Sequence, residues 1–265
     1  MGAVAGAGAA GPNDPMTIEL RALPELPELR PGDDLAAVLA RPLEREGIRA
    51  RDVLVISHKV VSKCEGAVRA LGEVEPGERA RSLGVELDRD PRLVQVVLDE
   101  SRAVLRAESG VLICETRHGM VCANAGVDAS NAPGEDVVVL LPVDPDGSAR
   151  ALRSGLGARL GVAPGVVIAD SFGRAWRIGQ CDVAIGCAGI RPMEDWRGRV
   201  DRAGRPLRAT WIAVADELAA AADLARGKDS GEPAVVVRGV GHLVSPDNGP
   251  GAAALRRPAE QDLFR

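Results

Sequence analysis

Short apolar runs, each long enough for only one buried strand, constrain the fold of this 265-residue chain most strongly. They lie at residues 52–56, 137–141, 165–169 and 234–238. Helical patterns separate them, at residues 34–46, 76–100, 147–160 and 213–226, and further strand-like segments lie between residues 104 and 123. Because these elements do not alternate in a steady βαβ rhythm, the pattern favours an α+β fold over a doubly wound sheet.

The length suits one large domain or two closely associated subdomains. The first 15 residues, MGAVAGAGAAGPNDP, lack the basic start and apolar run of a signal peptide and indicate a disordered tail. Residues 16–245 would form the folded domain, and the Gly- and Pro-rich residues 246–265 a loose C-terminal tail. No stretch of the sequence reaches the roughly 18 continuous apolar residues of a membrane span, so we expect a cytoplasmic protein with no membrane partner.

Composition argues against several classes of function. A formal net charge of −5 and only two Phe, three Trp and no Tyr argue against bulk nucleic-acid binding and base stacking. The five Cys contain no C-x-x-C pair, which argues against a disulfide framework or a zinc ribbon. The three His are too few and too scattered for a His-rich metal site.

The segment SHKVVSKCEG, residues 57–66, directly follows the apolar run at 52–56. Lysines at a strand end suit phosphate oxygens, to which they offer a point charge. A solvated turn with two surface lysines is the ordinary alternative. The chain has no G-x-x-x-x-G-K-[ST] motif, so any nucleotide is bound in another way.

Two acidic segments offer oxygen ligands for a hard cation. In AGVDASN, residues 125–131, the donors are Asp128 and Asn131, although the same residues readily form an Asx-turn. In ADSFGRAWRIGQ, residues 169–180, Asp170 is expected where an apolar strand stops, and Ser171 adds a hydroxyl. Two carboxylates about 4 Å apart would repel by roughly 4 kcal/mol at an effective dielectric near 20. If Asp128 and Asp170 converge, a bound cation is the simplest explanation.

Three further features are weaker candidates. Arg174, within the second acidic segment, offers a forked donor for phosphate or carboxylate. The LPEL turn at residues 26–29 is by composition only a loop, on which a base or ribose could rest. Gly227 is an ordinary helix C-cap, and Lys228 after it could face a phosphate.

Six segments occur in an order typical of one family: GDDL, DVLVISHKVVSKCEG, AGVDASN, ADSFGRAWRIGQ, VADELAAAADL and VVVRG. Together they resemble the coenzyme F-420-0:L-glutamate ligases (γ-glutamyl ligases), over residues 18–240 or so of the chain. Some bacterial members carry a further C-terminal flavin-binding, nitroreductase-like domain. The chain ends at Arg265, so we expect the single-domain form.

The resemblance implies a fold and an activity. Members join L-glutamate to the lactyl carboxylate of F-420-0, with GTP and Mg²⁺ or Mn²⁺, often with K⁺, and some add further γ-linked glutamates. GTP is split to GDP and phosphate. The family fold is α+β with two subdomains, and its members form intertwined homodimers.

The resemblance also implies site residues. The guanine-nucleotide loop corresponds to Leu26, Pro27, Glu28 and Leu29, the phosphate side to His58 and Lys63, and further nucleotide contacts to Asn131, Gly227 and Lys228. Asp128 and Asp170 correspond to metal ligands, and Ser171 to a hydroxyl ligand. At the position of Lys228, archaeal members tend to carry an acidic or amide side chain, which would serve a second metal.

These residues suggest a hypothesis for the mechanism. GTP would phosphorylate the substrate carboxylate, and the amine of glutamate would attack the acyl phosphate. We assign the metal to Asp128 and Asp170, and the offsetting of negative charge to Lys63 and Arg174. The alternatives are a ligase for another small carboxylate and a nucleotide-binding relative that has lost catalysis.

Overall fold

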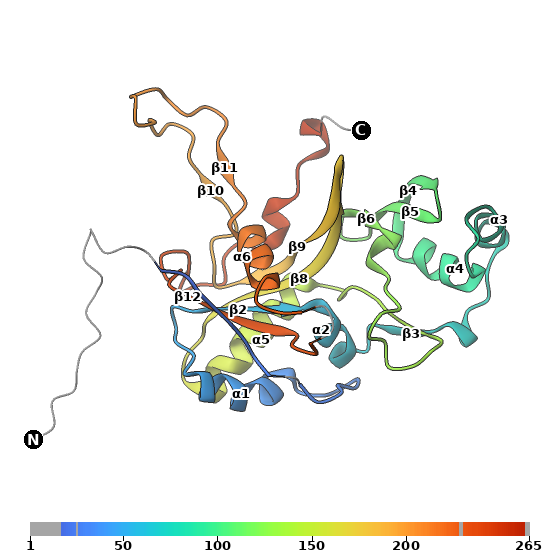
Figure 1. Cartoon of the computed structure of the whole chain (residues 1–265), viewed down its shortest axis with the longest axis horizontal. Coiled ribbons are helices and arrows are strands. Elements are labelled where there is room, and N and C mark those ends of the chain that lie inside the picture. Colours follow the sequence, from blue (N-terminus) through green and yellow to red (C-terminus); the bar gives the residue numbers. More distant parts are fainter. Residues whose placement is uncertain (1–16, 25, 228–229, 263–265) are drawn as a thin grey trace, which may run out of the picture.

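The computed structural model describes residues 17–24, 26–227 and 230–262. In this part of the chain the largest sheet has five strands, in the order β1-β12-β2-β8-β9 (Figure 1). They are β1 (Glu19–Ala22), β12 (Ala234–Arg238), β2 (Val53–Ser57), β8 (Gly165–Arg174) and β9 (Arg177–Ala188). Neighbours are antiparallel except β2 and β8, which are parallel, with Ser57 opposite Ala169. The carboxyl end of β2 therefore lies beside the middle of β8.

Helices cover both faces of this sheet because its central strands are apolar on both sides. They are α1 (Leu35–Glu46) and α5 (Pro145–Leu160) on one face and α6 (Val214–Asp223) on the other (Figure 1). Leu54 and Ile56 of β2 share a core cluster with α1 and α5, whereas Val53 and Val55 share one with α6. This alternation is the two-residue period of a strand.

A separate core cluster lies in the part of the chain between residues 67 and 140. Its elements are β3 (Val68–Ala70), α3 (Glu78–Leu87), α4 (Pro91–Asp99), β4 (Ser101–Glu108), β5 (Val111–Thr116), β6 (Val121–Ala123) and β7 (Val137–Val139). β3 pairs with β7, and β4, β5 and β6 form a small antiparallel sheet. Small sheets and helices beside a mixed main sheet confirm the predicted α+β class.

The segment 57–66 is a helix rather than a solvated turn, which corrects that alternative. α2 (His58–Glu65) begins immediately after β2 and ends at Gly66, whose φ of 71° lets its N–H reach Lys63 O and Ser62 O. His58, Val61 and Ser62 face inward at helical spacing. The helix is only two turns long and has few apolar residues, so its period is hard to recognise in the sequence.

The second acidic segment is a β-hairpin, so β8 does not stop at Asp170 as predicted. β8 continues to Arg174 and pairs with β9, which places Ser171 opposite Asp182 and Gly173 opposite Gln180. The turn comes only after Arg174. Polar residues at 170 and 171 looked like a strand end, but both belong to a half-exposed part of a continuing strand.

Residues 245–253 are packed against α5, unlike the loose tail that their composition predicts. The buried side chain of Arg153 donates to Ser245 O at 3.0 Å and to Asn248 Oδ1 at 2.9 Å. Asp146 accepts the N–H of Ala252 at 2.7 Å. Polar contacts from α5 thus hold a segment that has few apolar residues of its own.

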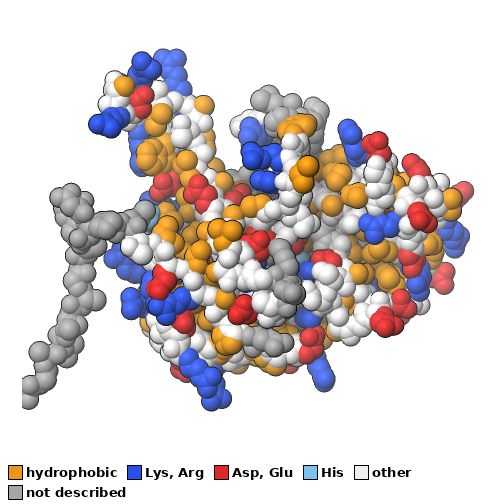
Figure 2. All heavy atoms as spheres, in the orientation of Figure 1, with side chains coloured by type: hydrophobic (Ala, Val, Ile, Leu, Met, Phe, Trp, Pro, Cys, Tyr) orange, Lys and Arg blue, Asp and Glu red, His pale blue; other side chains and the backbone are white. Residues whose placement is uncertain are grey.

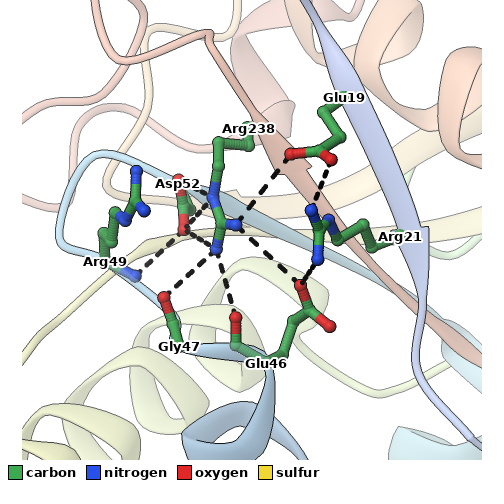
Figure 3. A network of polar contacts seen from close by, with 7 residues as sticks. All are labelled: Glu19, Arg21, Glu46, Gly47, Arg49, Asp52 and Arg238. Atoms are coloured by element: carbon green, nitrogen blue, oxygen red, sulfur yellow. Dashed lines mark hydrogen bonds and ion pairs between the residues drawn. The ribbon is translucent and has the colours of Figure 1, made fainter.

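A polar network at the β1 edge of the main sheet joins β1, β12, the start of β2 and the end of α1 (Figure 3). We call it the sheet-edge network. Arg238 donates to Asp52 Oδ2 at 3.1 Å and to Gly47 O at 3.1 Å. Asp52 also accepts the N–H of Arg49 at 3.0 Å. The hydrogen bonds and ion pairs of this network join three chain segments that are far apart in the sequence.

An arm formed by residues 193–212 projects from the main body, and Arg side chains gather on it (Figures 1 and 2). Its strands are β10 (Glu194–Asp195) and β11 (Trp211–Ile212), and Arg197 lies 4.2 Å over the ring of Trp211. Among the helices of the described residues, none is long and apolar enough to span a membrane.

Candidate active site

A cavity of about 520 Å³ opens where the carboxyl end of β2 meets β8. The turn after β1, the first turns of α2, the base of the β8–β9 hairpin, the loop at 128–131 and the chain after α6 surround it. In sheets with parallel strands, ligands bind beyond the carboxyl ends of those strands. Within the described residues, β2 and β8 are the one parallel pair of the main sheet. The cavity lies beyond the carboxyl end of β2, as this rule predicts.

The structure brings most of the predicted site residues together in this cavity. The predicted residues that line it are Leu26, Pro27, Glu28, Leu29, Lys63, Asp128, Asn131, Asp170, Ser171 and Gly227. They come from five segments that are far apart in the sequence. Their convergence confirms that the two acidic segments face one space.

Two predicted residues have a different placement. His58 does not line the cavity: it is buried behind it, with Nε2 3.3 Å from Asp170 Oδ1 and Nδ1 3.3 Å from Ser62 Oγ. Arg174 lies outside the cavity, and its guanidinium donates to Ile178 O at 2.9 Å and Gly179 O at 3.3 Å within its own hairpin. Arg174 therefore does not face the cavity in this structure, and its role toward phosphate stays a prediction. Lys228 lies outside the described residues.

Asp128 is held by two neighbours on the cavity wall. Lys59 Nζ lies 2.7 Å from its Oδ2, and Ser130 donates its N–H to Oδ1 at 2.7 Å and its hydroxyl to Oδ2 at 2.9 Å. The Asx-turn that the sequence suggested thus forms around a carboxylate that also faces the cavity. Partial burial raises the pKa of Asp128, but the hydrogen bonds and charge of Lys59 and the bonds from Ser130 outweigh it and lower the pKa overall. The carboxylate is anionic at neutral pH.

Lys59 went unpredicted as an individual residue although its segment was a candidate. On a helix, Lys59 and Lys63 are four residues apart and share one face. Lys63 donates to Glu28 Oε1 at 2.7 Å and so links α2 to the LPEL turn. Glu28 is largely exposed, so this ion pair is weak and Lys63 can exchange Glu28 for a ligand oxygen.

Asp182 and Arg226, which sequence reasoning missed, form the cavity wall beside Ser171. The Ser171 hydroxyl donates to Asp182 Oδ1 at 2.5 Å, and Arg226 donates to Asp182 Oδ2. The carboxylate of Asp182 is only 1% exposed. Their approach depends on the β8–β9 register and on the position of the end of α6, which no local pattern reveals.

A family model described as F420-0:Gamma-glutamyl ligase matches residues 24–239. The chain belongs to this family. A protein of Methanopyrus kandleri named Coenzyme F420:L-glutamate ligase is 45% identical over 251 residues, which cover 94% of this chain and 98% of that protein. Proteins of the same name from Haloarcula marismortui and Methanothermobacter thermautotrophicus are each 41% identical over 255 residues, 94% of this chain and 96% and 100% of theirs.

The donor set of this γ-glutamyl ligase family member fits a cation that arrives with a phosphate ligand. Within the described residues, no group of three or more His, Cys, Asp or Glu side chains is arranged to hold a metal by itself. Mg²⁺ commonly binds through one or two carboxylates together with substrate phosphates. Asp128, Asp170 and the Ser171 hydroxyl offer that smaller set on one cavity.

The nearby thiol of Cys122 does not line the cavity. Cys122 is buried on β6, and burial, with a contribution from the charge of Asp170, raises its pKa to about 12. A thiol must lose its proton to bind a metal or to act as a nucleophile. Cys122 is therefore a packing residue below the cavity.

Proposed function

We propose that this chain joins L-glutamate to the lactyl carboxylate of coenzyme F420-0, with GTP as the co-substrate and GDP and phosphate as products. Family membership supports the ligase chemistry, and the relatives that match over nearly their whole length are named for it. The observation that carries the proposal is the convergence of the LPEL turn, the α2 lysines and two aspartates on one cavity.

The divalent cation, Mg²⁺ or Mn²⁺, is part of this proposal. Asp128, Asp170 and Ser171 would hold it, and when bound it would neutralise the oxygens of the nucleotide phosphates. Lys59 helps to keep the Asp128 carboxylate anionic, and an anionic carboxylate suits a cation ligand. We include K⁺ in the proposed requirements because the family resemblance implies it.

In the proposed reaction, an oxygen of the substrate carboxylate takes the γ-phosphoryl group, and the bond from that phosphorus to the β-bridging oxygen breaks. The glutamate amine then attacks the carbonyl carbon, loses a proton and expels inorganic phosphate. Catalysis by positioning and charge neutralisation requires no nucleophile from the protein. Lys63 would offset phosphate charge after it leaves Glu28, and Asn131 and the LPEL turn would position the nucleotide.

Mass spectrometry of the product tests this function. Purified chain is incubated with F420-0, L-glutamate, GTP, Mn²⁺ and K⁺, and GDP is measured in parallel. Product heavier by one glutamyl unit, with GDP formed in equal amount, is the expected result, and heavier products would count further additions. GTP binding without glutamate-dependent GDP would instead indicate a relative that has lost catalysis. GDP formation only with another carboxylate would indicate a different acceptor.

We also propose a homodimer in the cytoplasm, with the projecting arm as its contact. Trp211 on β11 is 45% exposed and Trp196 beside β10 is 36% exposed, and large aromatic residues are enriched in interfaces. Light scattering after size exclusion would measure the mass of the assembly. Replacement of both tryptophans by serine is expected to give monomers, and a monomeric wild-type chain would contradict the proposal.

A further inference from the structure

The carboxylate of Asp182 is the most buried acid on the cavity wall, and neither composition nor family resemblance drew attention to it. It lies opposite Ser171 in the β8–β9 register, and its side chain is 1% exposed. A buried carboxylate needs strong partners, because its removal from water is unfavourable. The residues that bind the Asp182 carboxylate therefore indicate its role.

One partner fixes the carboxylate in place. Arg226, whose side chain is 9% exposed, donates to Asp182 Oδ2 and to Pro233 O at 3.0 Å. Arg226 also lies near Asp223, with Nε 3.6 Å from Oδ1. A guanidinium with several partners holds its planar fork in one orientation, and this holds the carboxylate plane of Asp182 as well.

A second partner is the Ser171 hydroxyl, which faces the cavity. The Ser171 hydroxyl donates a hydrogen bond to Asp182 Oδ1 at 2.5 Å. A serine hydroxyl has one proton and two lone pairs. Because the proton is committed to Asp182, the oxygen of Ser171 is an acceptor toward other neighbours, as a cation ligand has to be.

We propose that Asp182 is a positioning residue, which accepts the hydrogen bond of the Ser171 hydroxyl and so presents a lone pair of the Ser171 oxygen to a divalent cation in the cavity. This inference rests on the proposed function, because it presupposes that a cation binds there. Arg226 contributes indirectly, because its hydrogen bond prevents the Asp182 carboxylate from turning. Groups in this position orient metal ligands and raise metal affinity.

Replacement of Asp182 by Asn has a defined structural consequence. A guanidinium only donates, so the amide oxygen will face Arg226 and the amide NH₂ will face Ser171. The Ser171 oxygen then accepts from the amide, and its proton turns toward the cavity. Shape and volume are retained, but the hydroxyl presents the wrong atom to a cation.

The test is a double-mutant cycle on Mn²⁺ affinity, with free Mn²⁺ measured by electron paramagnetic resonance in the presence of saturating GDP. Asp182→Asn is expected to weaken Mn²⁺ binding about 10- to 100-fold. In the Ser171→Ala background, Asp182→Asn is expected to alter the Mn²⁺ affinity by no more than about 2-fold, because the hydroxyl through which Asp182 acts is already absent. A 2-fold change is about the deviation from additivity seen between independent sites. An undiminished loss in that background would overturn the proposal, because Asp182 would then act without Ser171.

Controls separate this inference from the proposed function and from a folding defect. Wild-type chain that binds no Mn²⁺ with GDP would contradict the proposed metal site itself, and this inference with it. Ser171→Thr, which keeps the hydroxyl, is expected to bind Mn²⁺ within about 2-fold of wild type. If Asp182→Asn lacks the wild-type thermal unfolding transition, Asp182→Glu, which keeps the charge beside Arg226, replaces it in the cycle.

A matched control comes from the sheet-edge network. Asp52→Asn disrupts another buried aspartate–arginine pair, with Asp52 3% exposed, outside the cavity. It is expected to change Mn²⁺ affinity by less than about 2-fold. An equal loss in Asp52→Asn would show that general destabilisation explains the effect of Asp182→Asn and would overturn the proposal.

Discussion

Two buried aspartate–arginine pairs lie at different edges of this fold and contrast in what else they touch. At the sheet edge, Asp52 and Arg238 bind each other and the backbone of residues 46–49 (Figure 3). At the cavity, Asp182 binds Arg226 with one oxygen and the Ser171 hydroxyl with the other. Both pairs join distant segments, but only the second ends on a side chain that faces the cavity.

The contrast shows that burial of an ion pair does not by itself indicate function. Replacement of a buried pair by apolar residues is often neutral, whereas loss of one partner is strongly destabilising. Both pairs are therefore expected to be sensitive to mutation. What distinguishes them is the groups that each pair reaches: backbone carbonyls and the carboxylates of Glu19 and Glu46 in one, and a cavity hydroxyl in the other.

The largest expected effect is on catalysis, at the cavity. Asp170→Asn removes a proposed cation ligand directly, so product formation is expected to fall more than about 100-fold, beyond the usual effect of an indirect contact. Mass spectrometry of the glutamylated product measures this. Circular dichroism is expected to show an unchanged fold, since Asp170 is only partly buried. Wild-type turnover in this variant would remove Asp170 from the site.

The next effect concerns stability, at the sheet edge. Asp52→Asn leaves the charge of Arg238 without its buried partner, so the free energy of unfolding is expected to fall by about 3–5 kcal/mol. Urea titration measures the change. Turnover per folded molecule is expected to stay at the wild-type value, because Asp52 lies outside the cavity. A selective loss of turnover would mean that the two networks are coupled.

A smaller effect is expected at Lys59, and it depends on pH. Lys59→Met removes the ion pair to Asp128, and because Asp128 is 41% exposed the Mn²⁺ affinity at neutral pH is expected to change by no more than about 5-fold. In the wild type, the pKa of Asp128 is lowered, so its stabilising contact is present at neutral pH and is lost as pH falls through that lowered pKa. Without the lowering effect of Lys59, the pKa of Asp128 is higher than in the wild type. Loss of Mn²⁺ binding on acidification is therefore expected at a higher pH in Lys59→Met.

Measurement of Mn²⁺ affinity from neutral to acid pH in the wild type and in Lys59→Met checks this sign. Lys59→Arg is the control, since it keeps the positive charge beside Asp128. An acid midpoint at lower pH in Lys59→Met than in the wild type would contradict the assigned cause of the pKa shift.

The smallest effect is expected at Arg174, which belongs to neither network. Its guanidinium binds carbonyls of its own exposed hairpin, so Arg174→Ala is expected to change kcat/KM by less than about 2-fold and the free energy of unfolding by at most about 1 kcal/mol. Steady-state kinetics with the glutamate-dependent assay measures the first quantity. A large loss would mean that the hairpin turns toward the ligand when it binds.

The sequence alone determined the regular elements and the class of fold. The apolar runs became β2, β7, β8 and β12, because a strand of five or so residues that is apolar throughout needs cover on both faces. Helix α1 begins and ends close to its predicted limits, with Asp34 as N-cap and Gly47 at its C-terminus. Motif order also indicated both acidic segments.

The tertiary structure alone decided which polar groups meet. Asp182 lies 11 residues from Ser171 and 44 from Arg226, and a strand register and a helix end bring the three together. Local sequence encodes the period and the caps of an element, whereas a hydrogen bond between distant segments depends on how whole elements pack. For that reason Asp170 was visible as a candidate, and Asp182, which positions its neighbour Ser171 in our proposal, was not.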